Sequence, residues 1–224
     1  RNAEYRVSRW SAAWRSSCAW SHAGFRRKRL SRNRASHPVS PTVPPPQQPA
    51  ADIGVNADVL FLNLKKYHDE SSGGFYQAPK FPHEPYLAFL LAYYERTNDK
   101  QALDIVTHSL RKMAAGGLYD QVGCGFHRYA VDRNWYVPHF EKMLYNQAMC
   151  ASIYTKVFAL TNNPFFAVVA RGTLEFVAGP MTSQEGGFYT AIDAETDGIE
   201  GAYYAWSAEE LQQAIATLKD VAGT

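Results

Sequence analysis

A short aromatic loop pattern recurs three times in this chain and restricts the folds that the chain can adopt. Each copy has a Gly-x-Phe-aromatic core, at residues 73–76, 123–127 and 186–189. The phenylalanines of successive copies are 51 and 62 residues apart, and each interval has room for two helices. A repeated helix hairpin whose first loop carries such a pattern is typical of a stacked or closed array. We therefore expect an all-α body that forms part of an (α/α) toroid, the alternative being an irregular all-α domain with Gly-rich connections.

Helical periodicity between the loops agrees with this expectation. The predicted helices cover about residues 55–64, 85–97, 100–115, 140–160 and 164–178, with a last helix from Ser207. Asp52 or Asn56 could cap the first helix, and Ser207 with Glu210 forms a capping-box pattern. The apolar face predicted for the first helix contains Val55, Val59, Leu60, Leu62 and Leu64.

The charge is divided unevenly along the 224 residues. Residues 1–50 contain ten Lys/Arg and one acid, Glu4, followed by a proline tract from Pro38 to Pro49. Residues 51–224 contain the remaining 13 basic and 20 acidic side chains. We interpret residues 1–50 as a disordered tail or a non-native translation product, and residues 51–224 as the folded body. The alternative for the tail is an arm that attracts nucleic acid or a membrane.

Composition also favours some compartments over others. Three cysteines, Cys18, Cys124 and Cys150, have no metal-type spacing and suit a reducing compartment, so we expect a cytoplasmic protein. The longest apolar runs are far shorter than the roughly 20 residues that span a membrane. The Arg-rich start has no apolar segment typical of a secretory signal.

Several longer motifs resemble a known family. They read GGFYQAPKFP from Gly73, GLYDQVG from Gly117, GFHRY from Gly125, PHFEKMLY from Pro138 and EGGFYTAIDA from Glu185. In this order, over about residues 55–215, they resemble the YyaL and spermatogenesis-associated thioredoxin-domain family.

The resemblance implies an N-terminal thioredoxin-like domain followed by a six-hairpin (α/α)6 barrel, similar to those of glycoside hydrolases and N-acylglucosamine 2-epimerases. Residues 51–224 would then form the first half of that barrel. The family's redox motif reads Cys-His-Trp-Cys-His, whereas the nearest string here is Cys18-Ala-Trp-Ser-His22. A dithiol cycle needs two thiols, so we expect the thioredoxin-like domain to be missing.

Glycoside cleavage needs two carboxyl groups, one on each side of the scissile bond. Asp120 lies between Gly-rich turns, and Asp193 follows the third aromatic loop, so we expect the two to face one pocket. The other loop candidates are Glu141, Glu195, Asp197 and Glu200. The alternative is that these carboxylates cap helices or bind backbone amides in turns.

An epimerase needs an acid–base group that removes a proton next to a carbonyl, and histidine performs this role near neutral pH. His127 and His139 are the candidates, and Arg128 could hold an anionic or hydroxyl-rich ligand. Lys142 would share a face with His139 if a helix begins near residue 140. The alternatives are packed structural histidines and a solvated helix start at Glu141-Lys142.

Aromatic side chains gather in the predicted loops rather than along one helical stripe. Sugar rings stack on aromatic faces, so such loops suit a carbohydrate cleft. The predicted substrate-binding residues are Tyr119, Gln121, Arg128, Trp135, Tyr189, Glu195 and Trp206. The alternative is that the rings fill the narrow end of the toroid.

We expect no metal ion and no cofactor. No two His or Cys residues have zinc-type spacing, and the acidic string from Asp193 to Gly198 lacks the downstream ligand of a calcium loop. The leading hypothesis is a carbohydrate-binding or carbohydrate-processing region, either glycoside hydrolase-like or epimerase-like. The alternative is a non-catalytic scaffold that accompanies a thioredoxin-like domain. No nucleic-acid or membrane partner is expected for the body, and an open half-ring should self-associate through its apolar seam.

Overall fold

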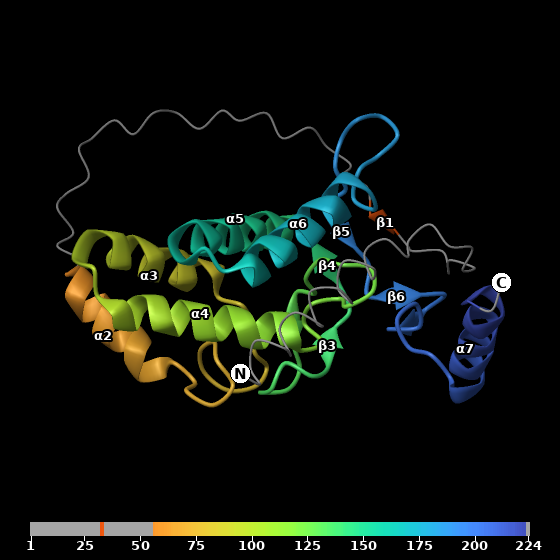
Figure 1. Cartoon of the computed structure of the whole chain (residues 1–224), viewed down its shortest axis with the longest axis horizontal. Helices are drawn as coiled ribbons and strands as arrows, with labels where there is room; N and C mark the ends of the chain where they lie inside the picture. Colours follow the sequence, from red (N-terminus) through yellow and green to blue (C-terminus); the bar gives the residue numbers. More distant parts are fainter. Residues whose placement is uncertain (1–31, 34–55, 223–224) are drawn as a thin grey trace.

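The chain folds into paired helices joined by long loops that carry short strands (Figure 1). The computed structural model describes residues 32–33 and 56–222. Their helices are α2 (Ala57–Tyr67), α3 (Glu84–Thr97), α4 (Lys100–Ala115), α5 (Leu144–Thr161), α6 (Pro164–Ala178) and α7 (Ala208–Ala222). The predicted all-α class is confirmed. The predicted tail lies outside the described residues except for residues 32–33, and so does the string at residues 18–22.

Short side-chain caps set several of these helix boundaries. The Asn56 side chain accepts hydrogen bonds from the first turn of α2, and Asp99 does the same for α4. The predicted capping box of α7 is confirmed, because the Ser207 amide donates to Glu210 Oε2 and the Glu210 amide donates to Ser207 Oγ.

The helices pack as neighbouring hairpins around one apolar core. α3 packs against α4 and α5, α5 packs against α6, and α2 lies against both α3 and α4. Fully buried side chains in this core include Leu87, Leu90, Leu91, Leu110, Met113, Tyr154 and Phe166. α7 lies beyond the loops, away from the packed helices (Figure 1).

The three long loops lie side by side because short antiparallel pairings join them. The strands are β1 (Arg32–Asn33), β2 (Tyr129–Ala130), β3 (Pro138–His139), β4 (Lys142–Met143), β5 (Ala191–Ile192), β6 (Glu195–Thr196) and β7 (Ile199–Glu200). β5 pairs with β1 and β4, β2 pairs with β3, and β6 pairs with β7. Lys80 in the first loop bridges Ala130 in the second, so all three loops are linked.

The three aromatic loops share one local build, which confirms the repeat read from the sequence. Isolated bridges close each loop on its phenylalanine, at His68–Phe75, Tyr119–Phe126 and Thr182–Phe188. In the first two loops an aspartate, Asp69 or Asp120, donates its amide hydrogen to the carbonyl of the glycine five residues later. The first and second loops are therefore structurally equivalent.

The predicted start of the fourth helix is wrong. Residues 138–143 form β3 and β4, and α5 begins only at Leu144. His139 pairs with Tyr129, and Lys142 pairs with Ile192. These pairings with distant segments outweigh the local helical pattern, so His139 and Lys142 do not share a helical face.

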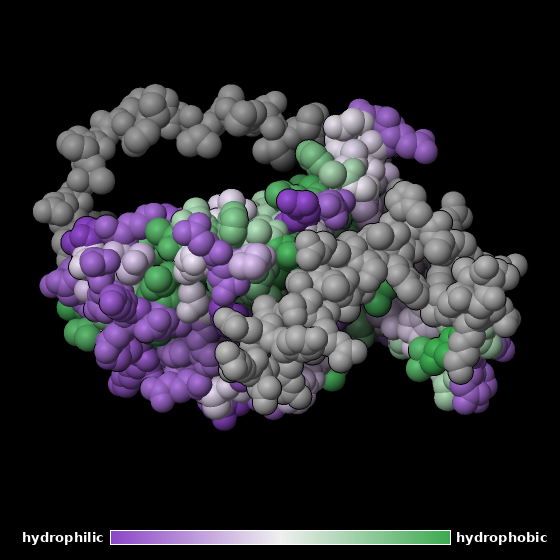
Figure 2. Space-filling model, viewed as in Figure 1, coloured by the Kyte–Doolittle hydropathy of each residue, from purple (hydrophilic) through white to green (hydrophobic). Residues whose placement is uncertain are grey.

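The predicted apolar face of the first helix is also partly wrong. Val59 and Leu62 are exposed, whereas Phe61 and Leu64 are buried. Figure 2 shows hydrophilic surface over α2 and α4. Within the described residues, none of the helices combines the length and apolar character that a membrane crossing requires.

Candidate functional site

Asp120 and Lys142 form a buried ion pair inside the second loop. Lys142 Nζ donates to Asp120 Oδ2 at 2.8 Å and to the Cys124 carbonyl at 2.8 Å. Asp120 Oδ1 accepts hydrogen bonds from the amides of Val122 and Gly123. Burial by itself raises the pKa of Asp120, but Lys142 and these amides outweigh burial and lower the pKa. This carboxylate is therefore ionised and engaged in holding the turn.

His127 lies beside this pair and is enclosed. Its side chain stands edge-on to the rings of Phe140 and Tyr204, and its Nδ1 lies 3.1 Å from the Phe140 carbonyl oxygen. Burial, followed by the charge of Lys142, lowers the pKa of His127 to about 3. The imidazole is therefore neutral at physiological pH, and its Nδ1 carries the proton and donates it to the Phe140 carbonyl oxygen.

A second, more accessible group of charges lies at the β2–β3 pair. His139 Nδ1 lies 2.7 Å from Glu200 Oε1, and His139 Nε2 lies 3.8 Å from Glu141 Oε2. The imidazole thus stands between two carboxylates that come from different loops. Arg128 Nη1 donates to Glu141 Oε2 at 3.1 Å and fixes that carboxylate.

Aromatic rings continue this group of charges. Tyr129 stacks on His139 with 5.0 Å between ring centroids, and Phe81 stacks on Tyr129 at 4.7 Å. All three side chains are partly exposed. Together with Glu141 and Glu200 they form a set that we call the loop-end cluster. It combines a stack of rings with carboxylates and an imidazole, the groups that bind and activate sugars.

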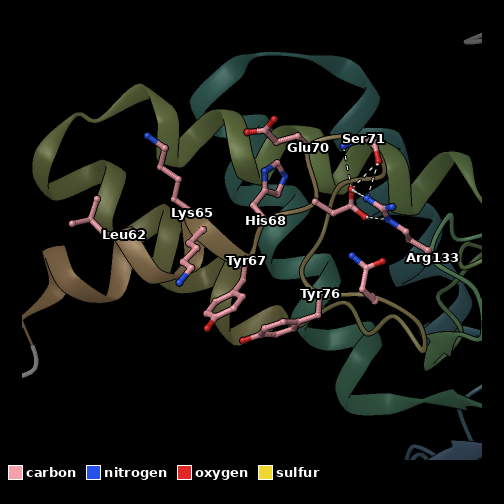
Figure 3. A pocket seen from close by; sticks show the side chains of 11 residues that line it. Leu62, Lys65, Tyr67, His68, Glu70, Ser71, Tyr76 and Arg133 are labelled. Atoms are coloured by element: carbon pink, nitrogen blue, oxygen red, sulfur yellow. Dashed lines mark hydrogen bonds and ion pairs between the residues drawn. The ribbon is translucent and has the colours of Figure 1, made fainter.

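The first loop holds a matching ion network next to an open hollow of about 900 Å³ (Figure 3). Asp69 binds the buried Lys80 at 2.7 Å and receives two hydrogen bonds from Arg133. The Arg133 guanidinium holds the pKa of Asp69 well below its usual range against the effect of burial, and Lys80 and nearby turn groups assist. Arg133 comes from the second loop, so this network ties the first two loops together.

Several predicted substrate-binding residues have structural contacts. Trp135 is fully buried and donates from its indole nitrogen to the Ser72 carbonyl at 2.8 Å. Tyr119 is buried against Phe126. The Gln121 amide donates to carbonyls at and after the end of α4.

The predicted residues of the third loop have contacts and exposure of their own. Asp193 accepts a hydrogen bond from the Glu195 amide, which places Asp193 in a turn. Glu195 and Trp206 are exposed, and Tyr189 is partly exposed. Among the described residues no hydrogen bond or ion pair joins Asp193 to Asp120.

The sequence did not identify the residues whose side-chain contacts join the loops. Glu200, Phe81 and Tyr129 belong to larger sets of loop carboxylates and aromatics, and nothing in the sequence paired them with His139. Asp69 had a detectable signal, because it precedes its Gly-Phe pair by the same spacing as Asp120. Within residues 56–222, no group of three or more His, Cys, Asp or Glu side chains is assembled for a metal ion.

Comparison with known proteins identifies the relatives of this chain. No family model matches it. Spermatogenesis-associated protein 20 of Mus musculus is 43% identical over 179 residues, which cover 75% of this chain and 22% of the mouse protein. The Homo sapiens protein of the same name is 45% identical over 179 residues, with 75% of this chain and 23% of the human protein covered.

The chain belongs to the family of spermatogenesis-associated protein 20. It spans less than a quarter of the length of these two members. The suspected family is thereby confirmed at the level of homology.

Solved structures confirm the fold. A cellobiose 2-epimerase from Bacillus thermoamylovorans has a TM-score of 0.52 at 16% identity, over 64% of this chain and 38% of that chain. A sugar epimerase from a ruminal bacterium has a TM-score of 0.54 at 16% identity, over 68% and 40%. A family 76 mannosidase from Bacteroides thetaiotaomicron has a TM-score of 0.51 at 13% identity, over 60% and 37%. This chain therefore has the fold of a partial six-hairpin glycosidase-like toroid.

Proposed function

We propose that the loop end of this helical body binds carbohydrate at the loop-end cluster. The proposal rests on the surroundings of His139. Its imidazole contacts two carboxylates, and it also stacks with a series of partly exposed rings. Rings give a sugar an apolar face to lie on, and the charged groups bind its hydroxyls. The fold adds support by analogy, because structural neighbours are named as sugar epimerases and a mannosidase.

The reaction class that suits this geometry is epimerase-like proton transfer. In the tautomer whose Nδ1 donates to Glu200, Nε2 of His139 carries the lone pair that would accept a proton. Nε2 would remove the proton from the carbon next to a sugar carbonyl. A water molecule would donate a proton to the other face of the resulting enolate, and the hydroxide left behind would take the proton back from Nε2. Glu141 stands near Nε2 and is held by Arg128, so it would bind a sugar hydroxyl next to the reacting carbon.

Calorimetric titration of the 224-residue chain with mono- and disaccharides tests the site. Tyr129→Ala removes the central ring of the stack and should weaken sugar binding about five- to thirtyfold, as expected for about 1–2 kcal/mol of stacking. Tyr136→Ala is the matched control, because Tyr136 is 72% exposed in the same loop and lies outside the cluster. The control should bind as the unchanged chain does. Equal binding by the two variants, or no binding by the unchanged chain, would refute the proposal.

The second candidate function is a non-catalytic scaffold or interaction domain. A shallow apolar groove between α5 and α6 favours it, with Phe158 and Leu174 partly or largely exposed at its wall. An apolar edge of this kind would pack against another protein segment or against a second copy. Sedimentation of Leu174→Glu should then show less association than the unchanged chain. Val122→Glu, at a 75% exposed loop position, serves as the control for added charge.

A further inference from the structure

Two histidines from different elements meet beside the hollow of the first loop. His68 follows the last turn of α2 and lines the hollow, and its imidazole is visible in Figure 3. His108 lies in the middle of α4. His68 Nε2 is 3.4 Å from His108 Nδ1, the ring centroids are 5.4 Å apart and the planes cross at 81°.

The two nitrogens point towards one another within hydrogen-bonding distance, so one imidazole can donate to the other in the metal-free chain. Nitrogen hydrogen-bond donors usually lie about 2.7–3.2 Å from their acceptors, and an in-line bond as long as this one would separate the centroids by about 5.7 Å. Two imidazoles on one tetrahedral zinc ion, each with a metal–nitrogen distance of about 2.05 Å, have nitrogens about 3.4 Å apart and centroids about 5.2 Å apart. The nitrogen separation of 3.4 Å in this chain matches the second arrangement, and the centroid separation of 5.4 Å lies between the two.

We propose that His68 and His108 bind one divalent transition-metal ion of the zinc class through His68 Nε2 and His108 Nδ1. Imidazole is a preferred ligand for such ions and binds through either ring nitrogen. The site lies at the first loop and is independent of the carbohydrate proposal, which concerns the loop-end cluster.

The backbone holds the two rings in place before any ion binds. The His68 amide donates to the Lys65 carbonyl, and His68 also bridges Phe75 across the first loop. On the other side, the Gly74 amide donates to Ser109 Oγ at 2.8 Å, which ties the loop to α4 next to His108. Ligands that are already positioned lose little entropy on binding. Both histidines are only partly buried, and His68 lines the hollow.

The remaining coordination positions fall to Glu70 and water. Asp69 is not available, because its two oxygens accept from Lys80, Arg133 and the Ser71–Ser72 turn. Glu70 is exposed, lines the same hollow and follows His68 by two residues. Since no three ligands are assembled among the described residues, Glu70 must turn inward or water must complete the set. Two histidines with a carboxylate and water form a familiar ligand set for such ions.

Titration of the metal-free 224-residue chain with Co²⁺, followed by visible absorption, tests the site. The unchanged chain should develop a saturable Co²⁺ spectrum at one equivalent, and Zn²⁺ should displace it. His68→Gln and His108→Gln should each abolish the spectrum. His83→Asn is the matched control, because His83 is a partly buried first-loop histidine outside the pair, and Asn tolerates its left-handed backbone. The control should bind Co²⁺ as the unchanged chain does.

Thermal unfolding with Zn²⁺ gives a second readout that does not depend on the colour of Co²⁺. Zn²⁺ should raise the Tm of the unchanged chain and of His83→Asn, because a ligand of the native state stabilises it. It should not raise the Tm of His68→Gln, whose side chain lies at the rim of the hollow. If His108→Gln fails to fold, the comparison between His68→Gln and His83→Asn is sufficient to test the proposal. A chain that gives no saturable Co²⁺ spectrum, or a His68→Gln variant that binds as the control does, would overturn the proposal.

Discussion

Lys142 Nζ lies 2.8 Å from Asp120 Oδ2, with only 1% of the lysine side chain and 11% of the aspartate side chain exposed. The ammonium also lies 4.3 Å from the centroid of the Phe176 ring. Asp120 belongs to the second aromatic loop, Lys142 to β4 and Phe176 to α6. The ion pair therefore joins three segments where the loops meet the helices. The equivalent place in the first loop has Asp69 with the buried Lys80.

Asp120→Asn should destabilise the fold strongly. The substitution keeps the shape of the side chain but leaves the Lys142 ammonium buried without a counter-charge, a loss of about 3–5 kcal/mol in the free energy of unfolding. Urea unfolding measures this. Glu95→Gln is the control, since the Glu95–Lys156 pair is similarly short at 2.7 Å but exposed, and its loss should stay below about 1 kcal/mol. Similar losses in the two variants would contradict the structural role of Asp120.

Trp135→Ala should act on folding. The side chain is fully buried and its indole donates to Ser72, so truncation should reduce the free energy of unfolding by about 3–5 kcal/mol. Trp206→Ala, at a 54% exposed position, should change it by no more than about 0.5 kcal/mol. Chemical unfolding of both variants gives the comparison. If Trp135→Ala reduced the free energy of unfolding only slightly, Trp135 would again be a candidate for stacking on a sugar.

Gly125→Ala should reduce the stability of the fold more than Gly186→Ala does, although both glycines have positive φ. The left-handed backbone penalises any Cβ by about 1–2 kcal/mol at either position. At Gly125 (φ +77°) the added Cβ would also lie 2.6 Å from Phe176 Cδ1, whereas at Gly186 (φ +85°) nothing lies within 4 Å. Crowding should add about 1–3 kcal/mol at Gly125 alone. Thermal unfolding of the two variants under one set of conditions separates strain from crowding.

The stability of the fold should fall as the pH is lowered from about 6.5 to 5. Burial and Lys142 lower the pKa of His127 from 6.5 to about 3, so the unfolded chain binds a proton in this window and the folded chain does not. Stability is present above the unfolded pKa and is lost towards the folded pKa, with a slope of about 1.4 kcal/mol per pH unit for one such group. His127→Gln should flatten the measured slope by up to that amount. An unchanged slope would mean that His127 protonates within the fold.

The positions of the helices follow from local signals. The bounds of α4 agree with the predicted residues 100–115, because Asp99 caps its start and Gly116 follows its end. The bounds of α6 agree equally well, because Asn163 and Pro164 set its start. Residues 138–143 are the exception. Their pattern is compatible with a helix, and only the distant partners Tyr129 and Ile192 make them strands.

The candidate site was less predictable than the fold. A carboxylate in a Gly-rich turn can be catalytic or can bind turn amides, and the sequence offers both interpretations of Asp120. The outcome depends on Lys142, which lies 22 residues away and would belong to a helix if local propensity decided. The pairing of His139 with Glu200 spans 61 residues and had no local signal.

By itself the sequence determined the helix boundaries other than the start of α5, the repeated loops and the family, because caps, periodicity and motifs act over a few residues. The tertiary structure decided which charges pair and which histidines meet. His68 and His108 are 40 residues apart and have no metal-type spacing, yet the docking of the first loop on α4 brings their nitrogens to 3.4 Å. Such pairs depend on packing because each buried polar group requires a partner. Which partner lies within reach depends on how whole helices and loops are arranged.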